Sequence, residues 1–270
     1  TAWNIHTAAY SVIGKDNAGA QLADQLDQRG VRCSGLIRSK DRATGLKTRI
    51  VAQRHQIVRV DREQKDLLSQ ELTKRLLLKV EKALTSKVAS VVLCDYGKGI
   101  VTQELLDRMV ELCRERGIWL SMDPKPVRSL RLHGLSLMTP NRKEAFALVQ
   151  RTETPGPDNP LKDTALLKVV DLLMKKANPA MMLVTLGEHG MLLCRRNQKP
   201  FHIPTMAKEV YDVSGAGDTA IAAFTVAVAG GASPVEAAII ANHAAGVVVG
   251  KVGTAISSVD ELLNTFPSDE

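Results

Sequence analysis

Apolar and polar positions alternate regularly from residue 89 to the end of the chain. Short apolar runs are separated by amphipathic stretches, the succession expected of β-α-β units around a mostly parallel sheet. We predict strands at 89–94, 118–122, 135–138 and 181–185, and a helix at 103–116 that Gly117 ends. The pattern therefore predicts an α/β fold, and the chain length favours one large domain.

The C-terminal part follows the same alternation with longer helices. Residues 191–194 and 200–203 predict a hairpin-type strand pair. Helices rich in small residues are expected at 217–229 and 234–249, and such helices pack closely against a sheet or a ligand. Asn242 lies in the second of them, where it can bond to neighbouring backbone or face the base of a nucleotide.

Residues 41–62 show a different pattern, with alternation on both sides of a polar turn. This predicts two antiparallel strands that form a small sheet beside the main one. Residues 152–160 contain three prolines and one glycine, so we expect a surface loop without regular structure there.

Charged or glycine-rich turns follow four of the predicted strands. In an open α/β sheet, ligands bind beyond the carboxyl ends of the strands, so these turns are expected to share one rim. They contain Asp95, Lys98 and Gly99; Asp123 and Lys125; Asn141, Arg142, Lys143 and Glu144; and Thr185, Gly187 and Gly190. One such ending is common by chance, whereas four together favour a binding site.

Each rim feature also has a purely structural interpretation. Asn141 and Glu144 have the N-cap and N3 spacing of a capping box, which is compatible with ligand binding. Asp123 and Lys125 can form a surface ion pair of little energetic value. Lys98 can be a solvated loop lysine.

The turn from Asp212 to Asp218 carries the strongest functional signal in the chain. Gly215 and Gly217 allow a sharp bend and bring backbone N–H groups close to a ligand, and the following helix directs its positive end to the same place. Asp218 can accept a proton from an attacking hydroxyl, as a carboxylate does in kinase chemistry. The structural alternative is a glycine turn in which Asp218 stabilises the first helical turn electrostatically.

Charge and composition exclude several classes of protein. The 270-residue chain has a formal net charge of +7, but only 3% of its residues are aromatic and its Lys and Arg are dispersed. Few rings are available to stack on bases, so nucleic-acid binding is not expected; ATP and a sugar phosphate explain part of the basic excess. No apolar run is long enough to span a bilayer and no signal peptide is visible, which predicts a cytoplasmic protein without membrane contact.

Cysteine and histidine usage adds two expectations. The four cysteines lie far apart without a C-x-x-C pair, which indicates free thiols in a reducing compartment. The six histidines show no zinc-ligand spacing, so we expect no structural metal.

The strand-end residues and the 212–218 motif resemble the ribokinase-like (PfkB) family of carbohydrate kinases, whose C-terminal signature this motif matches. Within that family the chain is most similar to the kinase domain of heptose-7-phosphate kinases. The supporting stretches are residues 49–54, 56–61, 93–99, 123–125, 139–144, 209–218 and 241–254. The resemblance implies a single ribokinase-like kinase domain over residues 1–270, with a mostly parallel sheet and a small β lid within 41–62.

The resemblance also implies an activity: transfer of phosphate from ATP, with Mg²⁺, to the anomeric hydroxyl of D-glycero-β-D-manno-heptose 7-phosphate. The 1,7-bisphosphate product would serve ADP-heptose and lipopolysaccharide-core synthesis. Asp218 would activate the sugar hydroxyl, while the amides of Gly215, Ala216 and Gly217 would hold the transferring phosphoryl group.

The family pattern further implies binding roles for individual residues. Nucleotide contacts are implied for Asn141, Arg142, Lys143, Glu144, Thr185, Gly187, Gly190 and Asn242, with Glu144 also serving Mg²⁺. Substrate contacts are implied for Asn4, Asp16, Arg49, Arg59, Lys98 and Lys125. Arg49, Arg59 and Lys98 are the candidates for the phosphate of the acceptor, because arginine binds phosphate in a forked geometry.

The start of the chain departs from the family pattern. Family members have a strand, lid segments and a Gly-Gly pair ahead of the helix that Thr1–Ala9 resembles, and some heptose kinases carry a nucleotidyltransferase domain. A shortened gene, a truncated chain or a substitute from another chain would each explain the difference, and kinase activity alone is expected.

Two alternatives stand beside the heptose kinase. One is a kinase for another sugar or sugar phosphate, and the other is a nucleotide-binding relative without catalysis. The resemblance also implies a homodimer formed through the lid.

Overall fold

The computed structural model describes residues 2–52, 55–207 and 209–267. Their contacts divide the chain into two compact units. Unit 1 contains Trp3–Thr85 and Gly97–Arg108, and unit 2 contains Ser86–Tyr96 and Met109–Glu270. The single kinase domain expected from the sequence stays a prediction.

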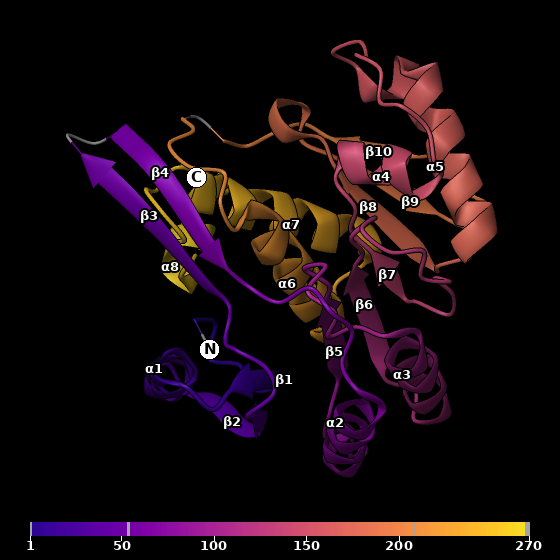
Figure 1. The fold of residues 1–270 in the computed structure, drawn as a ribbon. Coiled ribbons are helices and arrows are strands. Elements are labelled where there is room, and N and C mark those ends of the chain that lie inside the picture. The colour runs from indigo at the N-terminus through magenta and orange to yellow at the C-terminus, as the bar shows by residue number, and fades with distance from the viewer. Residues whose placement is uncertain (1, 53–54, 208, 268–270) are drawn as a thin grey trace. The chain divides into compact units, whose positions relative to one another are not determined.

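A six-stranded sheet forms the centre of unit 2 (Figure 1). Its order is β10-β9-β8-β7-β6-β5; β5 to β8 run parallel, and β9 is antiparallel to both of its neighbours, β8 and β10. The strands are β5 (Ser90–Cys94), β6 (Trp119–Asp123), β7 (Leu137–Met138), β8 (Met181–Thr185), β9 (Met191–Arg195) and β10 (Phe201–Ile203). The predicted mostly parallel sheet and the hairpin-type pair are confirmed.

The middle strands of this sheet are the most deeply buried. Leu137 and Met138 of β7 and Leu183 of β8 have no exposed surface. The apolar run at 89–94 predicts a buried strand, and this is wrong: β5 ends the strand order and Val92 is exposed. An outer strand has a neighbour on one side only, so its side chains are covered less completely.

Two long helices pack against each other and against this sheet. They are α6 (Ala216–Ala229), which contacts β5 and β6, and α7 (Pro234–Val249), which contacts β9 and β10 (Figure 1). Their alanines permit close approach, and the hydroxyls of Ser121 on β6 and Thr225 on α6 bond to each other at 2.7 Å in the core. This buried hydrogen bond sets where α6 lies along β6.

Five further helical segments in the described part of unit 2 differ in length, from three-residue 3₁₀ turns to a helix of 14 residues. They are α4 (Arg142–Leu148), η1 (Pro160–Lys162), α5 (Thr164–Ala177), η2 (Gly187–His189) and α8 (Val259–Leu263). The expected irregular loop is confirmed for residues 152–159, whereas Pro160 already belongs to η1. Proline suits that first helical position because its φ is preset and it has no N–H to satisfy.

Unit 1 begins with a parallel pair of strands, β1 (Thr7–Gly14) and β2 (Val31–Ser39), joined by α1 (Asn17–Gln28). The expectation of a helix over Thr1–Ala9 is therefore wrong: residues 2–4 form a turn and β1 starts at Thr7. The apolar and β-branched residues that follow Thr7 favour a strand once β2 is available to pair with it. Helix α2 (Gln70–Ala83) packs on both strands. Residues 103–108 of α3 (Gln103–Glu115) also belong to unit 1.

The predicted antiparallel pair is confirmed as a separate two-stranded sheet, β3 (Leu46–Ala52) and β4 (His55–Arg62), here called the ribbon. The connecting turn includes residues 53–54, which lie outside the described residues. Residues paired across the strands share a face, so Arg49 and Arg59 lie opposite each other on one face, with Lys47 and Asp61. The other face presents Leu46, Ile50, Val58 and Val60, all exposed.

Candidate active site

The Asp212–Asp218 turn leads into α6 as the sequence predicts. Gly215 is the N-cap residue and has a φ of 86°, which a side chain would strain. Asp218 lies in the first turn of α6 and is exposed. Asp212 holds the turn, since its two carboxylate oxygens accept hydrogen bonds from Ser214 N at 2.9 Å and Gly253 N at 3.2 Å.

The backbone N–H groups at the start of α6 differ in whether they already donate a hydrogen bond within the chain. Ala216 N already donates to Val213 O at 3.3 Å. Gly217 and Asp218 lie in the first turn, where a helix offers its own amides no acceptor. Gly217 is helical and does not form the sharp bend expected from the sequence. Its lack of a side chain leaves open space instead, since nothing lies within 4 Å of the position that a Cβ would take. An anion can therefore approach these amides closely.

Tyr96 contacts Asp218. Tyr96 follows β5, and its hydroxyl donates to Asp218 Oδ1 at 2.7 Å. Sequence reasoning did not select this tyrosine; its place directly after a strand-end aspartate is the signal that was available. The contact shows that the first turn of α6 lies at the carboxyl end of β5. We use "the rim" for the carboxyl ends of β5 to β8 with this turn of α6.

A three-residue charge cluster lies at the rim. Lys125 Nζ donates to Glu144 Oε1 at 2.6 Å and to Asp123 Oδ2 at 3.1 Å. Burial raises the pKa of Asp123 to about 6, although Lys125 opposes the shift. Burial by itself would lower the pKa of Lys125, but its bonds to Glu144 and Asp123 outweigh this effect and raise the pKa. Lys125 is thus a fixed cation between two carboxylates.

The capping box at α4 is confirmed. Asn141 Oδ1 accepts from Glu144 N at 2.9 Å, and Glu144 Oε2 accepts from Asn141 N at 2.9 Å. Thr185, at the end of β8, donates its N–H to Pro140 O, so the ends of β7 and β8 meet at this box. The structural interpretation of Asn141 and Glu144 therefore holds, and their nucleotide contacts stay a prediction.

Arg142 and Lys143 differ within the same helical turn. The Arg142 guanidinium pairs with Asp163 at 2.7 Å and Glu153 at 3.3 Å, and lies over the Phe146 ring. It thereby joins α4 to the N-cap of α5 and to the loop before it. Lys143 is exposed. Of these two basic residues, Lys143 is the freer to meet a phosphate.

The glycines after β8 have different roles. Gly187 has a positive φ of 59°, is exposed and has nothing within 4 Å of a built Cβ, so a ligand can approach its backbone. Gly190 is buried, and its Cβ would lie 2.1 Å from Ile203 O. Packing alone explains the glycine at 190. Buried Asn242 donates to Pro204 O at 2.7 Å, and its contact with adenine stays a prediction.

Five of the six predicted substrate residues lie in unit 1 and one, Lys125, in unit 2. Asn4 is exposed in the turn before β1, with a positive φ of 56°. Asp16 is the N-cap residue of α1: it accepts from Gly19 N at 2.8 Å and Thr44 N at 2.9 Å. These bonds, led by the one from Thr44, lower the pKa of Asp16.

The three candidates for the acceptor's phosphate are arranged in two ways. Arg49 and Arg59 are opposite each other on the ribbon, and Arg59 pairs with Asp61 at 3.0 Å. Like charges placed directly opposite destabilise a strand pair unless an anion lies between them. Lys98 instead pairs with Glu63, and its hydrogen bond lowers the pKa of that carboxyl.

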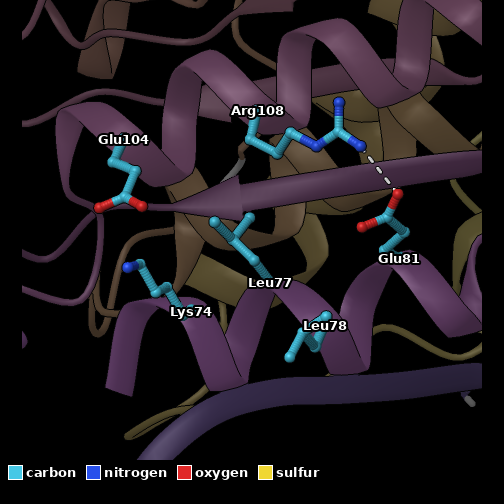
Figure 2. Close-up of a pocket in the computed structure, with 6 residues that line it drawn as sticks. All are labelled: Lys74, Leu77, Leu78, Glu81, Glu104 and Arg108. Carbon is cyan, nitrogen blue, oxygen red and sulfur yellow. Dashed lines mark hydrogen bonds and ion pairs between the residues drawn. The ribbon is translucent and has the colours of Figure 1, made fainter. Parts of the chain in front are cut away.

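A groove in unit 1 is lined by none of the predicted site residues. It measures about 350 Å³ and is lined from α2 by Lys74, Leu77, Leu78 and Glu81, and from α3 by Glu104 and Arg108 (Figure 2). Arg108 pairs with Glu81 at 2.8 Å across it. It is open and contains none of the motif residues, so it gives no support to a catalytic role.

Two further findings bear on the expectations from composition. All four cysteines are free, as predicted. Within the part of the chain that the structure describes, no helix is both long enough and apolar enough to cross a bilayer.

The rim combines the open start of α6 with the carboxylate of Asp218, at the carboxyl ends of parallel strands in an α/β sheet. The chain belongs to the pfkB family of carbohydrate kinases, whose model matches residues 3–261. Members of this family are ATP-dependent phosphotransferases. The family predicted from the sequence is thereby confirmed.

Among its relatives are bifunctional proteins named HldE. That of Sulfurimonas denitrificans is 40% identical over 252 residues, which are 93% of this chain and 50% of that protein. That of Helicobacter pylori is 39% identical over 252 residues, 93% of this chain and 52% of that protein. The chain thus spans about half the length of the curated relatives it matches.

Solved structures confirm the fold. Ribokinase from Thermotoga maritima superimposes with a TM-score of 0.73 at 23% identity, covering 96% of this chain and 80% of that one. Phosphofructokinase-2 from Escherichia coli in complex with potassium gives 0.78 at 20% identity, covering 97% and 82%. At these identities the likeness concerns the fold alone.

Proposed function

We propose that this chain transfers the γ-phosphoryl group of ATP to the anomeric hydroxyl of D-glycero-β-D-manno-heptose 7-phosphate, giving the 1,7-bisphosphate. The observation that carries the proposal is the start of α6, where Gly215, Gly217 and exposed Asp218 combine an open anion site with a carboxylate. The resemblance to HldE proteins supports the choice of heptose phosphate, a precursor of ADP-heptose and of the lipopolysaccharide core.

The transfer step requires little covalent chemistry from the protein. Asp218 takes the proton of the acceptor hydroxyl as that oxygen forms a bond to the γ-phosphorus. The bond from the γ-phosphorus to the bridging oxygen breaks, and its electron pair leaves with ADP. The N–H groups at the start of α6 face the charge that spreads over the transferring oxygens, which is where catalysis by stabilisation acts.

The residues present fit ATP. At Gly187, Gly215 and Gly217 nothing lies within 4 Å of the position that a Cβ would take, so phosphates can reach the backbone. In the proposal, Asn141, Lys143 and Thr185 border the nucleotide and Asn242 lies towards the adenine. Arg142 and Gly190 contribute to nucleotide binding indirectly, because they maintain the packing of the segments around the site.

The donor set suits Mg²⁺ that arrives with ATP. Glu144 is the candidate carboxylate, but its oxygens already accept from Lys125 and Asn141. Mg²⁺ typically keeps several waters and uses one or two carboxylates together with substrate phosphates. Glu144 would therefore act on the ion mainly through water, while Mg²⁺ neutralises charge on the phosphates.

Unit 1 is assigned to the acceptor. Arg49 and Arg59 would both bind the 7-phosphate, whose negative charge would offset the repulsion between the two arginines. Lys98 would either leave Glu63 to bind the phosphate or stay paired with Glu63 and add positive charge near it. Asn4 and Asp16 would contact the sugar. For Lys125, which lies in unit 2, the substrate contact stays a prediction. A substrate panel in which a neutral sugar is preferred over sugar phosphates would overturn this assignment.

Two further properties belong to the proposal. The apolar face of the ribbon, with Leu46, Ile50, Val58 and Val60 exposed, supports a homodimer that covers it. We place the reaction in the cytoplasm, where ATP and sugar phosphates are available.

The test is ADP release with ATP, Mg²⁺ and heptose 7-phosphate, with ribose as the control acceptor. Asp218→Asn is expected to lower kcat by about 10²- to 10⁴-fold, the usual contribution of a general base. ATP binding, measured by calorimetry, is expected to persist. Asp260→Asn is a matched control, because Asp260 also lies exposed in the first turn of a helix of unit 2.

Three outcomes separate the hypotheses. Heptose-dependent turnover lost only in Asp218→Asn supports the proposal. Equal turnover by Asp218→Asn overturns it. Tight ATP binding without turnover on any sugar indicates a nucleotide-binding relative instead.

A further inference from the structure

The base proposed above is not solitary. Asp218 Oδ1 accepts a hydrogen bond of 2.7 Å from the Tyr96 hydroxyl, although 122 positions separate the two residues in the chain. Packing sets the geometry from both sides. Tyr96 is placed by the end of β5, and Asp218 lies seven residues before Thr225, hence on the same face of α6 as the bond to Ser121. That face is the one turned towards β5 and β6.

A hydrogen bond from a neutral hydroxyl to a carboxylate is short and stronger than one between neutral groups. It restricts the rotation of the Asp218 side chain and engages one oxygen. Oδ2 then remains to meet the acceptor hydroxyl. Correct placement of a reacting group is itself a large part of catalysis, and small displacements are costly.

The surroundings keep Tyr96 a donor. Loss of hydration, followed by the bond to Asp218, raises the pKa of its phenol above the ordinary value. The titratable groups around the pair are Cys94 at the end of β5, and Asp123 with its partner Lys125 beyond β6. Burial raises the pKa of Cys94 to about 11, so it stays an uncharged thiol. Tyr96 is thus the neutral donor of the group.

We propose that Tyr96 is a positioning residue for phosphoryl transfer: its hydroxyl holds one oxygen of Asp218 so that the other receives the acceptor's proton. This inference rests on the proposed function, in which Asp218 is the base. Tyr96 itself takes up no proton and forms no bond to the substrate.

The test compares Tyr96→Phe with the wild-type chain and with Tyr211→Phe. Tyr211 is a matched control, since it is also exposed and its hydroxyl donates to a carboxylate, that of Glu209, at 2.8 Å. Two readouts are needed: steady-state kcat with KM for ATP and for the acceptor, and the effect of Tyr96→Phe when it is added to Asp218→Asn.

In Tyr96→Phe we expect kcat to fall by roughly ten-fold, the scale of a lost hydrogen bond to a charged group, while KM for ATP and acceptor changes by less than about two-fold. Added to Asp218→Asn, Tyr96→Phe should lower kcat no further, because the base that Tyr96 positions is already gone. Tyr211→Phe should leave kcat and both KM values unchanged.

The outcomes separate this inference from the function beneath it. Unchanged kcat in Tyr96→Phe overturns the inference, since the contact then has no part in transfer. An equal fall in kcat when Tyr96→Phe is added to Asp218→Asn overturns it too, since the tyrosine then acts other than through the base. If the wild-type chain lacks sugar-dependent turnover, or Asp218→Asn retains it, the proposed function fails and this inference fails with it.

Discussion

The rim of unit 2 and the ribbon of unit 1 differ in how much packing supports them. At the rim, the polar residues directly follow strand residues whose side chains have no exposed surface, such as Met138 and Val184. The ribbon has two strands, and an apolar face on which Ile50 and Val60 are about half exposed. A two-stranded sheet by itself is marginally stable, so further contacts must hold it in place.

The difference matches the two tasks proposed for the regions. Proton transfer needs a group held within a fraction of an ångström, which rigid strand ends supply. Binding the acceptor's phosphate needs charge that can close around an anion, which a loosely supported ribbon with paired arginines permits. The predictions below probe this contrast.

The largest expected effect concerns stability. Leu137→Ala removes a fully buried side chain of β7 and should lower the free energy of unfolding by about 3 kcal/mol. Ile50→Ala on the ribbon, where half of the side chain is exposed, should cost under about 1 kcal/mol. Urea unfolding followed by circular dichroism measures both. Equal losses would mean that the ribbon is as firmly packed as the rim.

The second largest expected effect is on binding of the acceptor, which should depend on the ribbon. Arg49→Ala and Arg59→Ala should each raise KM for the phosphorylated acceptor by roughly ten-fold or more, because each removes a charged hydrogen-bond donor. KM for ATP should stay constant. Arg32→Ala is the matched control, an exposed strand arginine of the same unit. A rise in KM for ATP of the same size would place these arginines at the nucleotide instead.

The smallest effect is a titration at the rim. Asp123 should titrate near pH 6 by carbon-13 NMR, because burial raises its pKa to about that value. Lys125→Met should move the midpoint higher still, since the lysine's charge opposes burial. The folded carboxyl binds its proton at higher pH than the unfolded one, so this group destabilises the fold above pH 6 and the penalty disappears as the pH falls towards 4. A midpoint near 4 would refute the burial argument.

Local patterns explain which elements were predictable. The apolar runs that became β5, β6, β8 and β9 and the small-residue helices α6 and α7 agree with prediction, as does the capping box of Asn141 and Glu144. These features depend on residues within a few positions of each other. The helix at Thr1–Ala9 was expected from the family resemblance and is wrong, because the residues from Thr7 onward pair with β2, more than twenty positions away.

The sequence by itself determined the fold class, the family and the residue types of the site, since motif spacing and hydrophobic period are encoded along the chain. Only the tertiary structure decided which groups meet: Tyr96 with Asp218, Lys125 with Glu144, and Asn242 with Pro204. The physical reason is that side-chain hydrogen bonds and ion pairs act over about 3 Å in space. Helix packing and strand register bring such atoms together, and neither can be inferred from the few residues on either side of each atom in the sequence.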